Sequence, residues 1–338
     1  MDYFDQDEVI SALKGSSKIS QRPLYSLWKH FPGQDLQPTD LVKAHIEFQD
    51  LVKSDVIKIS PHSKYCLVDF GLEFNKIEFN KETGSYITKK YPIHKISDWE
   101  KIDEFDPQTG ELGKQLEVVE QLSKEYSHIP TMMTVFLPAM IARKLVKDDN
   151  LLNHFYDDER LVLDRFNVIV KVMTEFARIC LENGSTGLFL ATQETDKKDS
   201  WTPKLWSKFA YPYDKKLLDA IKTKSEFQVL HLHGEEIFFK EVLEEFDVTT
   251  INFHSFKNFH SFFSSKEIFS LFRGGLLGGL EDSLFTDSLD KNSLENQIDT
   301  LIQSNIPISS RIILSPNCVL PQGASTDRLR DIITKIRL

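Results

Sequence analysis

The run QVLHLH at residues 228–233 decides how the chain is interpreted, because it begins as a buried β-strand and ends in two histidines. Side chains alternate across a strand, so His231 and His233 point to one face while Leu232 points to the other. Two imidazoles at the carboxyl end of a strand indicate either a functional site or an unusual piece of core. The segments on either side of this run bear on that choice.

Seven more apolar, β-rich runs occur along the chain, and segments with helical spacing separate them. The eight predicted strands cover residues 23–28, 55–60, 131–136, 186–192, 228–233, 249–254, 275–280 and 311–315. Several are continuous apolar runs, as expected for parallel strands covered on both sides. We predict one α/β domain over residues 1–338 with the fold of a (β/α)8 TIM barrel. A doubly wound open sheet is the alternative, since periodicity alone does not separate the two folds.

One segment interrupts this alternation of strands and helices. Residues 68–93 predict an antiparallel β-excursion after the second strand, with KETG at residues 81–84 as its turn. In a barrel, this excursion would project from the mouth, which is the end formed by the carboxyl ends of the strands. A lid, a dimer arm and a surface for docking a partner are all compatible with it.

The composition limits the possible partners. The 41 basic and 51 acidic residues give a net charge of −10, which argues against general binding to nucleic acid or to an anionic membrane. Cys66, Cys180 and Cys318 do not suggest a disulfide framework. The first residues lack the pattern of a signal peptide, and no apolar run approaches the roughly 20 residues that cross a bilayer. We expect a cytoplasmic monomer or homodimer that acts on a small molecule.

Three histidines and a cysteine follow predicted strands and would meet at the barrel mouth, where catalytic groups of this fold lie. His231 and His233 end the fifth strand, His254 ends the sixth, and Cys318 comes just after the last. Thiolate and imidazole ligands together suit Zn²⁺. The alternatives are that the histidines bind an anionic substrate or satisfy backbone groups, that His254 faces a helix, and that Cys318 is an ordinary buried residue.

Other polar or glycine-rich segments at predicted strand ends are candidates for contacting a substrate. The glycines of FRGGLLGGLEDS would let backbone approach a ligand closely, or would serve close strand packing instead. Glu194 and His254 are the candidate catalytic residues. The predicted substrate-binding residues are Lys29, His30, His62, Lys64, Thr192, Gln193, Asn252, Gly278, Gly279 and Glu281.

At these motifs the chain resembles the uroporphyrinogen decarboxylase superfamily, which also contains zinc-dependent corrinoid and thiol methyltransferases. The resemblance is carried, in this order, by RPLYSLWKHFPG, GSTGLFLATQ, VLHLHGEE, TTINFH, GGLLGGLED and IILSPNCVLP. It covers nearly the whole chain and implies a (β/α)8 barrel with its site at the carboxyl ends of the strands.

The chain departs from the pattern of the decarboxylases in this family. Their loop after the first strand is rich in arginine, whereas WKHFPGQD has none, and their aspartate after the second strand is replaced by Pro61 or His62. The tyrosine expected after the third strand is missing from FLPAMIARKL, and Cys318 replaces a histidine. Arginine binds carboxylates in a bidentate way that other cations do not reproduce, so decarboxylation of uroporphyrinogen is disfavoured.

The methyltransferase branch resembles the chain better. Its zinc ligands correspond to His231, His233 and Cys318, with histidine at position 233 where the branch has cysteine. A carboxylate ligand of some relatives aligns near Asn252, and His254 would substitute for it. The resemblance implies zinc as cofactor. The methyl donor would be a small molecule or a corrinoid bound at residues 275–281, and a corrinoid would be either free or carried by a partner protein.

Two other functions stay open at this stage. In a metal-free decarboxylase, Lys29, His30, Lys64 and Arg143 would hold carboxylates while His231 or His233 supplies a proton. A non-catalytic carrier or sensor would have kept the barrel and lost the chemistry. The polar His/Cys set at the predicted mouth argues against a non-catalytic carrier or sensor.

Overall fold

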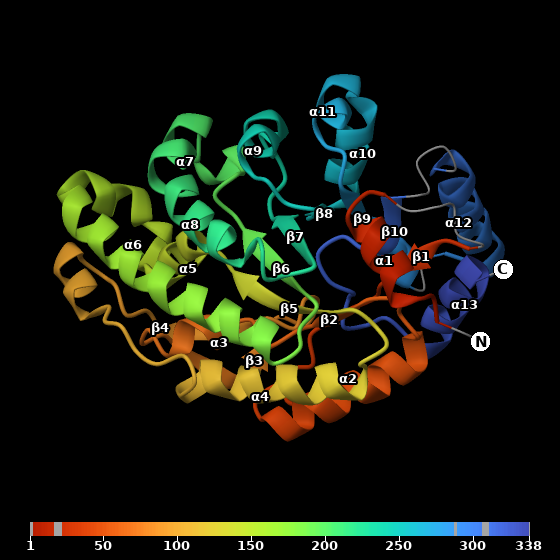
Figure 1. Ribbon diagram of the computed structural model, residues 1–338, viewed down its shortest axis with the longest axis horizontal. Helices are drawn as coiled ribbons and strands as arrows, with labels where there is room; N and C mark the ends of the chain where they lie inside the picture. Colours follow the sequence, from red (N-terminus) through yellow and green to blue (C-terminus); the bar gives the residue numbers. More distant parts are fainter. Residues whose placement is uncertain (1–2, 17–21, 287–288, 306–310, 338) are drawn as a thin grey trace.

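A computed structural model describes residues 3–16, 22–286, 289–305 and 311–337. Eight parallel strands form one curled sheet in the order β1-β10-β9-β8-β7-β6-β5-β2, with helices along its outer side (Figure 1). The strands are β1 (Leu24–Tyr25), β2 (Ile57–Ile59), β5 (Thr131–Phe136), β6 (Gly187–Thr192), β7 (Phe227–Leu232), β8 (Thr250–Phe253), β9 (Gly275–Leu280) and β10 (Ile312–Pro316). Each of the eight predicted runs overlaps one of them.

The strand order distinguishes the two predicted folds. It follows the chain from β2 to β10 and then returns to β1, so the crossovers never reverse direction as they do in a doubly wound sheet. The alternative of an open doubly wound sheet is therefore wrong, and the strand order is consistent with a TIM barrel. Among the described residues no backbone ladder joins β1 to β2, so an eighth strand pairing that closes the ring stays a prediction.

α1 precedes β1 and packs with inward side chains of the sheet, whereas the later helices follow the strands in sequence and pack outside the sheet (Figure 1). The helices are α1 (Gln6–Leu13), α2 (Pro38–Val52), α3 (Tyr65–Val68), α4 (Gly110–Glu125), α5 (Pro138–Leu145), α6 (Leu151–Glu182), α7 (Pro203–Phe209), α8 (Tyr211–Ile221), α9 (Phe239–Glu245), α10 (Phe256–Ser264), α11 (Lys266–Leu271), α12 (Lys291–Asn305) and α13 (Thr326–Arg337). Short 3₁₀ turns are η1 (Ile96–Lys101), η2 (Lys147–Asp149), η3 (Lys197–Asp199) and η4 (Asp282–Phe285). No helix in the described ranges has the length and apolarity that a membrane span requires.

The antiparallel excursion is confirmed as the pair β3 (Glu73–Phe79) and β4 (Tyr86–Lys90). Its turn reaches the loop after β10, where the backbone N–H of Gln322 donates to the carbonyl of Glu82 at 3.0 Å. Gly84 has a φ of +79°, and a Cβ there would lie 2.7 Å from Nε2 of Gln322. Glycine is thus needed at position 84 for both its backbone conformation and its close contact with the β10 loop.

The interior of the curled sheet has an apolar layer beneath a polar one. Inward side chains of the strands pack together with α1; this apolar set includes Val9, Leu13, Leu24, Val56, Met132, Val229, Leu277 and Ile313. Further along the same strands, towards their carboxyl ends, the inward residues Lys58, His231 and Asn252 are polar although buried. Buried polar side chains require partners, so this end of the sheet is where a site is expected.

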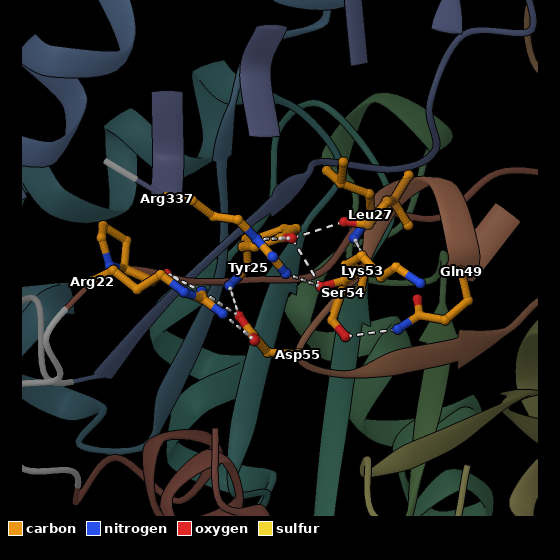
Figure 2. A network of polar contacts seen from close by, with 10 residues as sticks. Arg22, Tyr25, Leu27, Gln49, Lys53, Ser54, Asp55 and Arg337 are labelled. Carbon is orange, nitrogen blue, oxygen red and sulfur yellow. Dashed lines mark hydrogen bonds and ion pairs between the residues drawn. The ribbon is translucent and has the colours of Figure 1, made fainter. Parts of the chain in front are cut away.

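Asp55 joins the two edges of the sheet where the ladder is interrupted (Figure 2). Its backbone N–H donates to the carbonyl of Tyr25 at 2.9 Å, and its Oδ2 accepts from the backbone N–H of Tyr25 at 3.0 Å. The guanidinium of Arg22 binds both oxygens of the same carboxylate, at 2.7 and 2.9 Å. A side chain therefore replaces part of the missing ladder between β1 and the residues before β2.

Neighbouring residues extend this junction. The backbone N–H of Leu27 donates to Oγ of Ser54 at 2.9 Å (Figure 2). From α13, the guanidinium of Arg337 donates to the hydroxyl of Tyr25 and to the carbonyl of Lys53, both at 2.8 Å. The last helix thus fixes the same edge from outside.

We expect Asp55→Ala to lower the free energy of unfolding by about 3–5 kcal/mol, the cost of breaking a buried ion pair. The carboxyl of Asp55 is fully buried, and its loss leaves Arg22 and the N–H of Tyr25 without this acceptor. Urea unfolding measures the change. Asp50→Ala is the control, since Asp50 pairs with Lys53 in solvent and should cost about 0–1 kcal/mol. Equal losses in the two variants would show that the junction does not stabilise the fold.

Candidate metal centre

Two adjacent strands and one loop bring the predicted ligands together. His231 lies in β7 and pairs in register with Asn252 of β8, while His233 and His254 follow the ends of these strands. Cys318 lies in the loop after β10. One potential ligand atom from each of His231, His233, His254 and Cys318 falls within 4.8 Å of the others. The prediction that these four side chains converge is therefore confirmed, and His254 faces this group.

The separations fit a tetrahedral metal ion. Nε2 of His231 lies 3.4 Å from Nδ1 of His233, and Sγ of Cys318 lies 3.8 Å from the same nitrogen. Zinc bonds of about 2.0–2.1 Å to nitrogen and about 2.3 Å to sulfur at tetrahedral angles require about 3.4 Å between two nitrogens and about 3.6 Å between nitrogen and sulfur. These two separations, both measured from Nδ1 of His233, are therefore close to those of a zinc-type ligand set.

Asn252 fixes which nitrogen of His231 is available. Its Nδ2 donates to the carbonyl of Leu277 at 3.0 Å, so its Oδ1 must face the imidazole. Nδ1 of His231 donates to that oxygen at 2.5 Å. The proton of the neutral ring is thus on Nδ1, and the lone pair of Nε2 points at the other ligands. Asn252 orients a ligand and is not itself one.

His254 supplies a further nitrogen to the group. Its Nδ1 is buried and has no hydrogen-bond partner among the described residues, and its ring centre lies 4.0 Å from that of His233. A buried nitrogen without a partner is costly in a folded protein, and a metal ion or a proton donor would remove that cost.

Burial keeps all four groups uncharged near neutral pH. It lowers the pKa of His231 to about 3 and shifts the pKa values of His233 and His254 in the same direction, with repulsion among the imidazoles adding to the effect for His231 and His233. Burial raises the pKa of the Cys318 thiol to about 11, against the opposing charges of Lys58 and Lys144. The imidazoles therefore offer free lone pairs, while the cysteine must lose a proton to bind a metal.

Glu194 lies outside the four-residue group. Its carboxylate is fully buried, and its Oε2 accepts from the hydroxyl of Thr192 at 3.0 Å and from the backbone N–H of Gln193 at 3.1 Å. Arg143 approaches its Oε1 at 4.0 Å. Burial raises the pKa of Glu194. Thr192, Gln193 and Glu194, all predicted at this strand end, thus form one hydrogen-bonded unit.

Two of the predicted cationic residues have partners elsewhere. The ammonium of Lys29 lies over the rings of Phe31 and Phe48, at 5.8 and 6.0 Å from their centres. Nδ1 of His30 donates to the carbonyl of Pro61 at 3.2 Å. The four-residue group includes neither side chain.

The other pair follows β2. Nδ1 of His62 accepts from the backbone N–H of Lys64 at 3.3 Å, so its Nε2 carries the proton and donates to Glu111 at 3.1 Å. His62 is buried and held by these partners, whereas Lys64 is half-buried. Burial lowers the pKa of Lys64 to about 8.

The glycines of β9 divide into two roles. A Cβ on Gly278 would lie 2.8 Å from the ring of Phe259, so the absence of a side chain serves packing within the protein. Gly279 and Glu281 instead line a cleft of about 340 Å³ together with Phe256, Leu284, Asn296, Gln297 and Thr300. The positions of Gly279 and Glu281 in this cleft are thus compatible with contact to a ligand.

The sequence analysis missed Lys58. Its neighbours Ile57 and Ile59 belong to the outer core, so strand alternation turns Lys58 inward, where it is 7% exposed. The signal was present in VIKIS, where a lysine occupies the central position of a predicted strand between two apolar neighbours. Charged residues are almost never fully buried without a partner.

Comparison with known proteins identifies the family of the chain. The chain belongs to the uroporphyrinogen decarboxylase (URO-D) family, whose profile matches residues 31–337. Methylcobamide:CoM methyltransferases of Methanosarcina mazei and Methanosarcina acetivorans are 25% and 24% identical to it over 146 residues. The matched part covers 43% of this chain and 42% of each relative, so less than half of either protein is compared.

Solved structures support the fold. A methyltransferase from Methanosarcina mazei superposes with a TM-score of 0.80 at 14% identity, covering 99% of both chains. A B12-independent methionine synthase from Shewanella sp. W3-18-1 gives 0.55 at 11% identity, covering 95% of this chain and 98% of that one. At such identities the likeness concerns the arrangement of the chain and not its chemistry.

Zinc affinity should rise about tenfold for each pH unit between about pH 7 and pH 9, because the ion replaces the proton of one thiol. The pKa of Cys318 lies above this range and the pKa values of the three imidazoles lie below it, so only the cysteine loses a proton. Competition with a chelator at several pH values measures the slope. Cys318→Ala should bind weakly and without this slope, and an unchanged slope would contradict a thiolate ligand.

Asn252→Ala should weaken zinc binding about 10–100-fold, the usual effect of removing a residue that orients a ligand. The substitution removes the acceptor that holds the proton on Nδ1 of His231. Chelator competition measures the affinity. His260→Ala, an exposed histidine of α10, is the control and should leave the affinity unchanged. Equal affinities of Asn252→Ala and the wild type would mean that His231 is not a ligand.

Proposed function

We propose that the chain is a metal-assisted methyltransferase that acts on a small thiol, with one metal ion bound by His231, His233 and Cys318. The observation that carries the proposal is the convergence of these ligand atoms within 4.8 Å, with separations of 3.4 and 3.8 Å from Nδ1 of His233. Zn²⁺ bound there would supply Lewis acidity that turns a bound thiol into a thiolate near neutral pH. Family membership and the methyltransferase relatives point in the same direction.

The protein's own residues would prepare the thiol for attack. Asn252 keeps the lone pair of His231 directed at the site. The neutral ring of His254, whose Nδ1 has no hydrogen-bond partner in the described part of the chain, would accept the thiol proton or act as a fourth ligand before the thiol binds. The sulfur then forms a bond to the methyl carbon while the bond between that carbon and the donor breaks, and both electrons of the broken bond leave with the donor. We assign Glu194 the role of holding Arg143.

The donor is proposed to bind over the end of β9. Methylcobamide is the donor in the names of the two relatives, and a corrinoid is our proposal for this chain as well. The cleft beside Gly279 and Glu281, at about 340 Å³, is too small to enclose a corrinoid. It would contact one edge of the donor, which suits a corrinoid carried on a partner protein.

Decarboxylation receives less support from the geometry. Arg143 is already paired with Asp149 and, at 3.0 Å, with Asp199. His62 is bound to Glu111, and the ammonium of Lys29 lies over two phenyl rings. These three side chains, which would have to contact carboxylates of such a substrate, therefore already have partners within the protein.

The test is methyl transfer from methylcobalamin to 2-mercaptoethanol or 2-mercaptoethanesulfonate, followed by the cobalamin spectrum and by mass analysis of the thioether. We expect product from zinc-loaded protein and loss of both zinc and activity in His233→Ala. His260→Ala should retain both. Absence of thioether from fully zinc-loaded wild-type protein would contradict the proposal, and conversion of uroporphyrinogen to coproporphyrinogen would favour the decarboxylase instead.

A further inference from the structure

One candidate ligand, His233, lies just beyond the regular part of its strand. β7 ends at the preceding residue, and the backbone N–H of His233 makes one further bond, to the carbonyl of Thr192 at 3.0 Å. Yet Nδ1 of His233 is the atom that lies 3.4 Å from Nε2 of His231 and 3.8 Å from Sγ of Cys318. The turn that follows, residues 234–236, must therefore help to fix the direction of this side chain.

The carboxylate of Asp196, in the loop after β6, binds this turn. Its Oδ2 accepts from the backbone N–H of Glu235 at 2.8 Å, and its Oδ1 accepts from that of Glu236 at 2.9 Å. Asp196 is 3% exposed, so these charge-assisted hydrogen bonds are shielded from water. The backbone continues the contact, since Asp196 and Ile237 form an antiparallel bridge. One buried side chain thus ties the loop after β6 to the turn that follows His233.

Gly234 allows this close approach. Its φ is +150°, which favours glycine, and a Cβ there would lie 2.5 Å from Oδ2 of Asp196. Nδ2 of Asn258, a buried residue of α10, donates to the carbonyl of Gly234 at 2.5 Å. The peptide unit between Gly234 and Glu235 is therefore held at its oxygen by Asn258 and at its N–H by Asp196. This peptide unit begins one residue after the candidate ligand His233.

We propose that Asp196 is a positioning residue for His233, and that its hydrogen bonds to the turn set the direction in which Nδ1 of His233 meets the metal ion. The inference rests on the metal centre of the proposed function and not on the reaction performed there. Asp196 touches neither the metal nor the substrate in this role. Bonds of about 2.0–2.1 Å between zinc and nitrogen tolerate little displacement, so a turn that is less well held would weaken metal binding.

Asp196→Asn tests this role. The substitution keeps the size of the side chain but replaces one oxygen by an amide NH₂, which cannot accept from a backbone N–H. We expect the zinc affinity, measured by chelator competition, to fall about 10–100-fold. The rise of about tenfold in affinity per pH unit should persist, because the Cys318 thiolate is still a ligand. The absorption spectrum of Co²⁺-loaded protein should also change, since it reports the ligand geometry around the ion.

Asp69→Asn is the matched control, because Asp69 makes the same arrangement elsewhere. Its two oxygens accept from the backbone N–H groups of Glu111 and Leu112, at 2.9 and 2.8 Å. Gly110 precedes them with a φ of +62°, and a Cβ there would collide with the same carboxylate. This turn begins α4 and lies outside the four-residue group. Asp69→Asn should lower the urea midpoint of metal-free protein, as Asp196→Asn should, but leave zinc affinity and the Co²⁺ spectrum unchanged.

Unchanged zinc affinity in Asp196→Asn, or an equal loss of affinity in Asp69→Asn, would overturn the inference. Asn258→Ala is a second variant, which frees the carbonyl of Gly234 and leaves Asp196 in place. It should weaken zinc binding as well. If Asp196→Asn does not fold, Asn258→Ala decides the question, and wild-type zinc affinity in that variant would contradict the proposed role of the turn.

The positioning role and the proposed reaction fail in different ways. If zinc-loaded wild-type protein forms the thioether and Asp196→Asn binds zinc as tightly as the wild type, the methyltransferase stands and the role of Asp196 is wrong. If Asp196→Asn loses zinc affinity but wild-type protein forms no thioether, the positioning role stands and the proposed reaction is wrong.

Discussion

The curled sheet depends on the hydrogen bonds and the ion pair that Asp55 makes between its two edges. β1 is only two residues long, and among the described residues no ladder connects it to β2. Asp55 binds the backbone of Tyr25 in both directions and is neutralised by Arg22, so the two edges of the sheet stay together without a regular pairing. A buried carboxylate is stable there only because every one of these partners is present.

This junction matters for the site because both of its strands contribute inward side chains. Trp28, just after β1, contacts Cys318, and Lys58 of β2 lies between Trp28 and Phe189. If the edges separated, the aromatic surroundings of Lys58 and the support of Cys318 would separate with them. The polar layer at the carboxyl end of the sheet thus receives side chains from several strands. Asp55 holds two of these, β1 and β2, together.

The strands fix the positions of the candidate ligands, and burial keeps these side chains uncharged. Strand alternation aligns His231 with His233, and pairing of β7 with β8 places Asn252 directly behind the first of them. Burial keeps the imidazoles neutral, so they do not repel one another strongly at physiological pH and remain available as donors of lone pairs. A metal ion bound there would convert this neutral group into a cationic one.

The sequence by itself determined the eight strands, the excursion at residues 68–93 and the convergence of His231, His233, His254 and Cys318, because apolar runs and two-residue alternation are local and parallel strands end at one rim. Only the tertiary structure decided the partners. In the folded chain His62 binds Glu111, and the ammonium of Lys29 lies over phenyl rings. Asn252 binds and orients the candidate ligand His231, and Lys58 lies on the inner side of the sheet over Phe189. The physical reason is that a polar group's role depends on which donors, acceptors and rings surround it, and these come from segments that no local pattern connects.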